Sequence, residues 1–344
     1  MYHLTFYHSC QTHDQKTALA AQIARASAVF SVDEIIIFND GQSSRPRPAP
    51  RQQAHGGQYR DYAAEDEASG YTGYSDPDDF LYHVLSYLET PPHLRRMLFP
   101  MHPNLRTAGA MPSLDMPHHM KANEWCQYRE GVTMGPSGSG SNGVDGGAGK
   151  KRKNGGSEDS STLVDCGLPV KVRIPAEIDP DTRVTVKFSS TEEPYMDGYT
   201  PLDAEAVSPD APREEAGYYW GYSCRVASSL SAIFTETTYE GGYDLSIGTS
   251  ERGVSVQDLV GTSDREGLLP GDWQHLLLVY GGVAGLETAL AADAELLAKG
   301  VTDVKDLFDQ WVNLVPGQGS RTIRTEEAVW LGLMGFRPVV TSRQ

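Results

Sequence analysis

Apolar residues recur at regular spacing near the start of the chain. In residues 15–30, Leu19, Ile23 and Phe30 fall on one face, which predicts a helix. Residues 34–38 read EIIIF, a continuous apolar run that predicts a buried strand. A helix that leads directly into such a strand favours an α/β fold with a parallel sheet.

A second helix is predicted after Asp78. Its apolar face, at helical spacing, consists of Phe80, Leu81, Val84, Leu85 and Leu88. The proline pair at 91–92 ends it, because proline cannot donate a helix hydrogen bond. Residues 41–76, which precede this helix, contain little aliphatic sequence and are predicted to form a disordered insertion.

The middle of the chain has the two-residue period of strands. Residues 183–188 read RVTVKF, which predicts a half-buried antiparallel strand. With short strands expected at 129–133 and 168–174, this region predicts a small β-barrel. Residues 134–162 are rich in Gly and Ser and predict a second disordered insertion. Their basic run at 150–153 is either a solvated linker or a contact for nucleic acid or nuclear import.

The last third of the chain returns to alternating helices and strands. The expected helices cover residues 226–235, 286–298 and 326–334. The expected strands cover residues 243–247, 275–280 and 311–315. A β-rich segment, 96–216, therefore interrupts an α/β domain whose halves are 14–95 and 217–344.

Composition narrows the class of protein. Only 39% of the residues are hydrophobic, and the chain has 35 Gly and 21 Pro, which agrees with partly unstructured insertions. The net charge of −17 argues against a general nucleic-acid coat, although a binding face can be locally basic.

Neither a disulfide framework nor a membrane segment is expected. The four cysteines form no C-x-x-C pair and are interpreted as reduced thiols of an intracellular protein. No apolar run approaches the roughly 20 residues of a bilayer span, and the first ten residues lack the pattern of a secretory signal. We expect a soluble protein of the nucleus, nucleolus or cytoplasm. The histidines at 102, 118 and 119 match no zinc spacing with Cys126 and Cys166, so no metal is expected.

Three expected strands each end in an unusual loop. These loops are GTSERG (248–253), YGGVAGLE (280–287) and NLVPGQGSRTIRTE (313–326). Ligands of open α/β sheets bind beyond the carboxyl ends of the strands, so the loops predict a pocket rich in backbone N–H and C=O groups. The glycine loop alone is weak evidence, because it matches neither a dinucleotide nor a P-loop motif.

The third loop carries more polar residues than a helix start requires. Thr325 is expected to cap the last helix, and Glu326 and Glu327 suit its positive end. That leaves four polar side chains without a structural explanation: Asn313, Gln318, Arg321 and Arg324.

Seven long stretches carry a resemblance to a known family. They are QIARASAVFSVDEIIIF, YLETPPHLRRMLFP, LDMPHHM, REGV, YYWGYSCRVASSLSAIF, YDLSIGTSERG and VNLVPGQGSRTIRTEEA. In these stretches, which cover most of the chain outside the two insertions, the sequence resembles the eukaryotic and archaeal branch of SPOUT RNA methyltransferases with an inserted OB-fold. Eukaryotic members are also described as associated with the centromere or spindle.

The resemblance implies an α/β fold: a SPOUT trefoil-knot (α/β knot) domain with an inserted small OB-like β-barrel. It also implies a homodimer that binds S-adenosyl-L-methionine in the three loops. The family begins with a strand before the first helix. Residues 1–13 do not read clearly as a strand, so the sequence leaves open whether the first strand is present or missing.

The resemblance also supplies candidate site residues. Cofactor contacts are expected from Thr249, Arg252, Gly281, Gly282, Gly285, Asn313, Leu314, Pro316, Gly317, Gly319, Ser320, Thr322, Ile323, Arg324 and Thr325. We hypothesise that Arg252 stabilises the negative charge of the base that accepts the methyl group, with Glu251 or a water as proton acceptor. The alternative is that Glu251 and Arg252 form a local ion pair that shapes the loop.

Family members are linked to methylation of uridine N3 in large-subunit ribosomal RNA. The barrel with Arg95, Arg96 and Arg129 is the expected RNA surface. Trp125 and Tyr128 are either stacking residues or buried aromatics. Two other functions remain open: a non-catalytic RNA-binding scaffold in ribosome assembly or at the mitotic spindle, and a protein-methylating enzyme.

Overall fold

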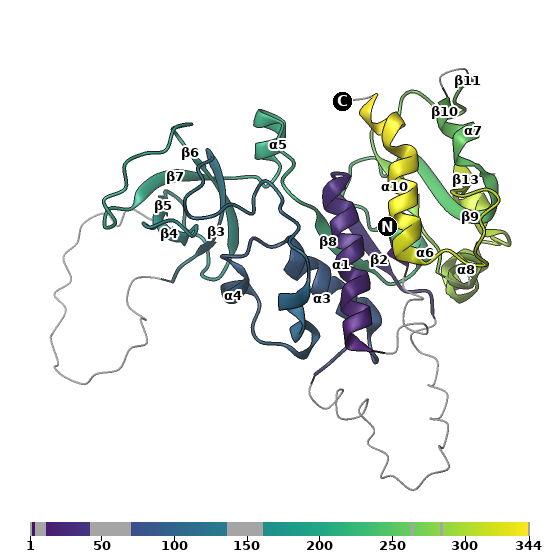
Figure 1. Ribbon diagram of the computed structural model, residues 1–344, viewed down its shortest axis with the longest axis horizontal. Coiled ribbons are helices and arrows are strands. Elements are labelled where there is room, and N and C mark those ends of the chain that lie inside the picture. Colours follow the sequence, from purple (N-terminus) through teal and green to yellow (C-terminus); the bar gives the residue numbers. More distant parts are fainter. Residues whose placement is uncertain are drawn as a thin grey trace, which may run out of the picture. The chain divides into compact units, whose positions relative to one another are not determined.

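The chain folds into two compact units, of which the second interrupts the first. The computed structural model describes residues 2–3, 12–41, 70–135, 161–262, 265–282 and 285–342 (Figure 1). Unit 1 comprises residues 1–89, 101–114 and 222–344, and unit 2 comprises residues 90–100 and 115–221. Residues 90–95 and 217–221 belong to unit 2, and residues 101–114 belong to unit 1. Most of the two predicted insertions, including the basic run at 150–153, lies outside the described residues.

Unit 1 contains two three-stranded parallel sheets. The first has the order β1-β2-β8 and consists of β1 (Tyr2–His3), β2 (Glu34–Phe38) and β8 (Ser223–Ala227). The second has the order β12-β9-β13 and consists of β9 (Leu245–Ser255), β12 (Leu276–Val279) and β13 (Gln310–Asn313). A short antiparallel ribbon joins β10 (Gly261–Thr262) to β11 (Arg265–Glu266). The prediction of an α/β fold with parallel strands is confirmed.

A short first strand is present. Tyr2 and His3 pair in parallel with Ile37 and Phe38 of β2. The first strand, whose presence the sequence leaves open, is therefore present, although β1 covers only two residues. The remainder of residues 1–11 lies outside the described part of the chain.

Helices flank the strands of unit 1. They are α1 (His13–Val29), α3 (Pro77–Glu89), α6 (Leu230–Thr235), α7 (Val256–Val260), α8 (Glu287–Ala292), α9 (Ala294–Ala298) and α10 (Thr325–Thr341), with short 3₁₀ turns at Pro103–Leu105, Ala108–Ala110 and Val304–Leu307. Helices α1 and α10 lie side by side (Figure 1). The rings of Phe30 and Trp330 meet edge to face at 5.7 Å. Side chains of β2, β12, α6 and α8 share one apolar core that includes Ile36, Leu277 and Leu290.

Side-chain caps set several helix boundaries that differ from expectation. The predicted helix at 226–235 is instead strand β8 followed by α6, because the Ser229 hydroxyl accepts the N–H of Ala232 and starts the helix there. The predicted helix at 286–298 is broken at Asp293, whose carboxylate accepts N–H groups at the start of α9.

Unit 2 contains a closed five-stranded barrel. Its strands are β3 (Tyr128–Thr133), β4 (Thr162–Asp165), β5 (Val172–Ile174), β6 (Arg183–Phe188) and β7 (Leu202–Val207), accompanied by helices α4 (Arg95–Leu98) and α5 (Ala211–Ala216). The order is β3-β4-β5-β7-β6, and only the β5–β7 pair is parallel. Inside lie Val164, Cys166, Val172, Val186 and Phe188. This small barrel is consistent with an OB-like insert.

Candidate functional site

The first of the three predicted loops is a bulge in strand β9. Trp311 of β13 pairs with Gly248, but the next residue, Val312, pairs with Val254, so residues 249–253 leave the sheet. Gly253 permits this course: a Cβ there would lie 2.4 Å from the main-chain carbon of Val312. The bulge therefore aims a polar segment outward at the end of the sheet.

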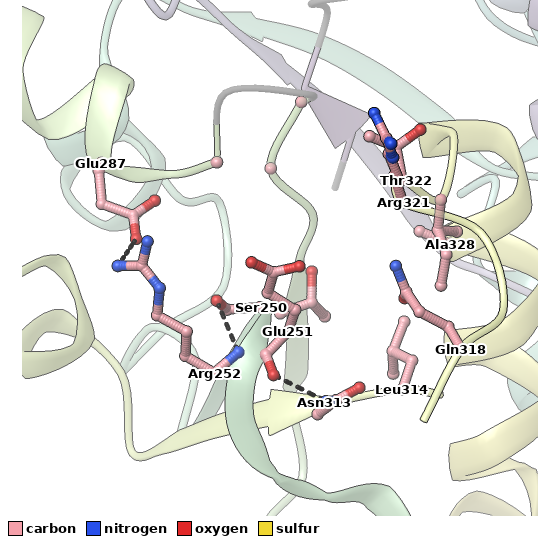
Figure 2. A pocket seen from close by; sticks show the side chains of 15 residues that line it. Ser250, Glu251, Arg252, Glu287, Asn313, Leu314, Gln318, Arg321, Thr322 and Ala328 are labelled. Atoms are coloured by element: carbon pink, nitrogen blue, oxygen red, sulfur yellow. Dashed lines mark hydrogen bonds and ion pairs between the residues drawn. The ribbon is translucent and has the colours of Figure 1, made fainter. Parts of the chain in front are cut away.

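Two hydrogen bonds join the bulge to the other loops. The Thr249 hydroxyl donates to the carbonyl oxygen of Val279, at the end of β12, at 3.0 Å. The Asn313 side-chain amide donates to the carbonyl oxygen of Glu251 at 2.7 Å (Figure 2). The three loops, far apart in sequence, therefore meet at the carboxyl ends of three adjacent strands, as the sequence predicts.

The loops enclose a cavity of about 410 Å³, which is within the range of small-molecule sites. It is lined by Thr249, Ser250, Glu251, Arg252, Gly281, Gly282, Gly285, Glu287, Asn313, Leu314, Gln318, Arg321, Thr322, Ile323 and Ala328. Figure 2 shows Arg252 and Glu287 on one side of it and Gln318, Arg321 and Thr322 on the other. The lining combines main-chain groups, charged side chains and a small apolar patch.

The glycine loop needs its glycines for close packing. A Cβ on Gly281 would lie 2.9 Å from the main chain of Gly285 and Leu286. Gly285 has a φ of +77° and donates its N–H to the carbonyl oxygen of Gly282 at 2.9 Å. The turn thus brings main-chain groups of Gly281 and Gly282 to the cavity wall, while the Glu287 carboxylate lies against Gly285.

Most of the predicted site residues line this cavity, and some do not. Those that line it are Thr249, Glu251, Arg252, Gly281, Gly282, Gly285, Asn313, Leu314, Thr322 and Ile323. Those outside its lining are Pro316, Gly317, Gly319, Ser320, Arg324 and Thr325. Sequence reasoning noticed Gln318 and Arg321 but gave them no role, and it missed Ser250, Glu287 and Ala328. Glu287 directly follows the glycine loop, a signal that could have identified it.

Arg252 pairs with a different acid from the one expected. Its guanidinium Nη1 lies 3.6 Å from Oε1 of Glu287, and the two side chains are 76% and 48% exposed. The alternative in which Arg252 forms a local pair with Glu251 is not what the structure has. The Arg252 N–H donates to the Ser250 hydroxyl at 3.3 Å, which fixes the backbone of the bulge.

The start of α10 is capped differently from the prediction. Arg324 rather than Thr325 is the N-cap residue, and its N–H donates to the Glu327 carboxylate at 2.8 Å. Thr325 is the first helical residue and is buried. Glu326 is also buried, and burial raises the pKa of its carboxyl group. These residues therefore anchor the helix at the edge of the cavity.

The three arginines predicted to contact RNA differ in how far their side chains are exposed. Arg96 is exposed on α4, and Arg95 is half-buried, with its Nε donating to the Thr90 carbonyl oxygen at 2.8 Å. Arg129 is only 1% exposed and donates to the main-chain carbonyls of Glu124 and Lys121 at 2.7 and 2.5 Å. Burial lowers the pKa of Arg129. The expectation that Arg129 contacts RNA is therefore corrected: it holds a loop against the barrel.

The two candidate stacking aromatics pack inside unit 2, Tyr128 in a cluster with Ala211 and Trp220 and Trp125 against the barrel core. Tyr128 is 2% exposed and donates its hydroxyl to Glu215 at 2.6 Å. Trp125 is half-buried, and its ring lies 4.8 Å from that of Phe188. The alternative that these are packed aromatics is the one the structure has.

Two other kinds of feature are absent from the described residues. Within the described ranges, no group of three His, Cys, Asp or Glu side chains could hold a metal ion. No helix in the part of the chain that the structure describes is long and apolar enough to cross a membrane.

Comparison with known proteins identifies the family. A sequence profile of the family described as "Putative RNA methyltransferase" matches residues 5–336. The chain belongs to this family. The SPOUT resemblance is thereby confirmed, and RNA methylation is the family's chemistry, which requires a methyl donor and an RNA substrate.

Three relatives carry the name 28S rRNA (uridine-N(3))-methyltransferase. The human protein is 37% identical over 332 residues, which are 96% of this chain and 75% of the relative. The mouse protein is 38% identical over 334 residues, 97% of this chain and 74% of the relative. The Drosophila melanogaster protein is 38% identical over 329 residues, but the chain spans only 59% of its length.

Proposed function

We propose that this methyltransferase uses S-adenosyl-L-methionine to methylate N3 of a uridine in large-subunit ribosomal RNA. The observation that carries the proposal is the convergence of three strand-end loops on one cavity of about 410 Å³. The names of the human, mouse and Drosophila relatives support the choice of uridine N3 and of ribosomal RNA. A ribosomal substrate favours a nucleolar or cytoplasmic place of action.

The cavity suits the proposed methyl donor. Gly281 and Gly282 bring main-chain groups to the cavity wall, where they are available to a nucleoside. Leu314 and Ile323 offer apolar contact for an adenine ring. When bound, S-adenosyl-L-methionine supplies an electrophilic methyl group on a positively charged sulfur. The predicted contacts outside the cavity lining, such as Gly319, would act by shaping the third loop.

The chemistry of the acceptor assigns roles to two charged residues. Uridine N3 carries a proton that must leave, and the resulting negative charge spreads to the ring carbonyl oxygens. The Arg252 guanidinium, exposed at the cavity, would stabilise that charge. Glu251, whose backbone is held by Asn313, would accept the proton directly or through a water. Holding the base in line with the methyl group would supply much of the rate.

Three finer features of the family complete the proposal. We propose that the third loop and α10 form a trefoil knot and that two copies assemble as a homodimer. We further propose that the barrel, with Arg95 and Arg96, contributes the RNA surface. The parallel order β12-β9-β13, with its loops at one end, supports the knotted fold.

The decisive test combines binding with mapping of the modified base. Calorimetric titration with S-adenosyl-L-methionine should show binding by the folded protein. Reverse-transcription stops in large-subunit ribosomal RNA should disappear from cells that lack the protein and return with the wild-type chain, but not with Arg252→Ala. A folded chain that neither binds the methyl donor nor restores a stop would instead be a non-catalytic RNA-binding scaffold. Methylation of protein but not RNA would indicate a protein-methylating enzyme.

A further inference from the structure

The ion pair at the mouth of the cavity joins two of its loops. Arg252 lies on the bulge of β9, and Glu287 is the first residue of α8, directly after the glycine loop. Both line the cavity and lie on the same side of it (Figure 2). Among the described residues, Glu287 is the only acid within ion-pair distance of the Arg252 guanidinium.

The position of the Glu287 carboxylate is itself defined by the glycine loop. A Cβ built on Gly285 would lie 2.2 Å from Oε2 of Glu287, so this oxygen rests against the turn where a side chain would otherwise be. The other oxygen, Oε1, faces Nη1 of Arg252. The lack of a side chain at Gly285 therefore leaves room for the carboxylate, which in turn pairs with the arginine.

We propose that Glu287 is a positioning residue for methyl transfer: it holds the Arg252 guanidinium at the mouth of the cavity, where the uracil base enters. This rests on the proposed function. A guanidinium has five N–H donors in a fixed planar arrangement, and one 3.6 Å ion pair leaves the others available for a base carbonyl. Without Glu287, the long and 76% exposed Arg252 side chain samples many rotamers.

The strength of the ion pair between Arg252 and Glu287 decides whether its loss affects folding or methyl transfer. An exposed ion pair contributes little to folding, because solvent screens it. Glu287→Gln should therefore leave the unfolding temperature unchanged. Methyl transfer depends on sub-ångström placement of the reacting groups, so the same substitution should lower the rate of the chemical step.

The test is a double-mutant cycle on single-turnover methylation. The enzyme is the full chain, and the RNA is large-subunit ribosomal RNA from cells that lack the protein. Glu287→Gln should lower the rate about fivefold to tenfold. In an Arg252→Ala background, the same change should alter the rate by less than about twofold, because the residue acts through Arg252. Glu287→Asp, which keeps the charge, should retain part of the rate.

A matched control variant and a binding measurement distinguish the positioning role of Glu287 from other roles. Glu295→Gln on α9 removes a similarly exposed ion pair, with Lys299, outside the cavity lining, and should leave the rate unchanged. Calorimetric affinity for S-adenosyl-L-methionine should be equal for wild type and Glu287→Gln. A weakened affinity, or independent multiplicative effects in the cycle, would overturn the positioning role. A folded wild type without methylation would instead overturn the proposed function.

Discussion

Arg129 and Arg252 place the same guanidinium group in opposite surroundings. Arg129 is buried and donates to two main-chain carbonyls, so it fastens a loop to the barrel. Its neighbour Glu130 is also buried and accepts from Arg183 Nε at 2.7 Å and Trp220 Nε1 at 2.7 Å. Arg252 is exposed and bound by one weak ion pair. A buried charge cannot leave its partners without a large penalty, whereas an exposed one can engage a substrate.

The role of Arg252 can be tested by two substitutions. Arg252→Ala removes the charge that would face the developing anion and should lower methylation about 10²–10³-fold. Arg252→Lys keeps the charge but loses the planar set of donors, and should fall between wild type and alanine. Single-turnover assays measure both, and circular dichroism checks folding. Unchanged turnover in a folded alanine variant would remove Arg252 from the mechanism.

Asp78 gives the fold a dependence on pH. Burial, together with the charges of Asp76 and Asp40, raises the pKa of Asp78 from 3.8 to about 7. The folded chain keeps this proton longer than the unfolded chain, so stability falls as pH rises from about 4 to about 7 and then levels off. Asp78→Asn cannot ionise and should be more stable than wild type at pH 8, by on the order of 2 kcal/mol, with little difference at pH 4.

Denaturant unfolding at both pH values measures this effect. Asp79→Asn is the matched control, because Asp79 is the adjacent residue of α3 and is exposed. It should not change the pH dependence of the wild type. If Asp78→Asn and the wild type lose stability in parallel between pH 4 and pH 8, the proton is not on Asp78.

Strand β9 begins as a central strand of the sheet and then contributes the bulge that lines the cavity. Its first residues pair with β12 and β13 as an ordinary central strand, and the core packs against Leu245 and Ile247. Five residues then leave the sheet and return in register with Val312. The sequence predicts a short strand at 243–247 and the loop that follows it. It does not predict the return, which depends on the close approach of Gly253 to β13.

Gly253→Ala should therefore damage the cavity more than the fold. The added Cβ would meet the Val312 main chain at 2.4 Å, so the bulge must shift. We expect a loss of stability of about 1–3 kcal/mol and at least roughly tenfold weaker binding of S-adenosyl-L-methionine. Gly109→Ala is the control, because nothing lies within 4 Å of a Cβ there. Wild-type affinity in a folded Gly253→Ala chain would contradict the proposed site.

Periodic elements were predicted well, and elements set by single contacts were not. The apolar faces of α1 and α3 and the alternation of β6 appear in the structure close to their predicted bounds. The last two residues of strand β8, 226–227, are predicted as helix because this short strand has no clear period. The break between α8 and α9 depends on one cap at Asp293, a contact that periodicity does not encode. The site follows the same rule: strand ends predict where loops meet, but not which loop residues face inward.

At the scale of the molecule, the two proposed binding activities lie on different units. The cavity is lined entirely by residues of unit 1, whereas the barrel and α4 belong to unit 2. The net charge of −17 means that RNA affinity must come from local cations rather than from the whole surface. Substitutions in unit 2 should therefore change RNA affinity without changing affinity for the methyl donor.

Arg96 allows that separation to be tested. It is exposed on α4, so Arg96→Glu should not unfold the barrel, whereas Arg129→Ala should, because it leaves buried carbonyls without donors. If α4 contacts phosphate, Arg96→Glu should weaken binding of a fluorescent single-stranded RNA about threefold or more and reduce the salt slope by about one. Lys305→Glu, an exposed cation of unit 1, is the control. Equal losses for Arg96→Glu and Lys305→Glu would mean that only overall charge matters, and the RNA surface would have to be sought away from α4.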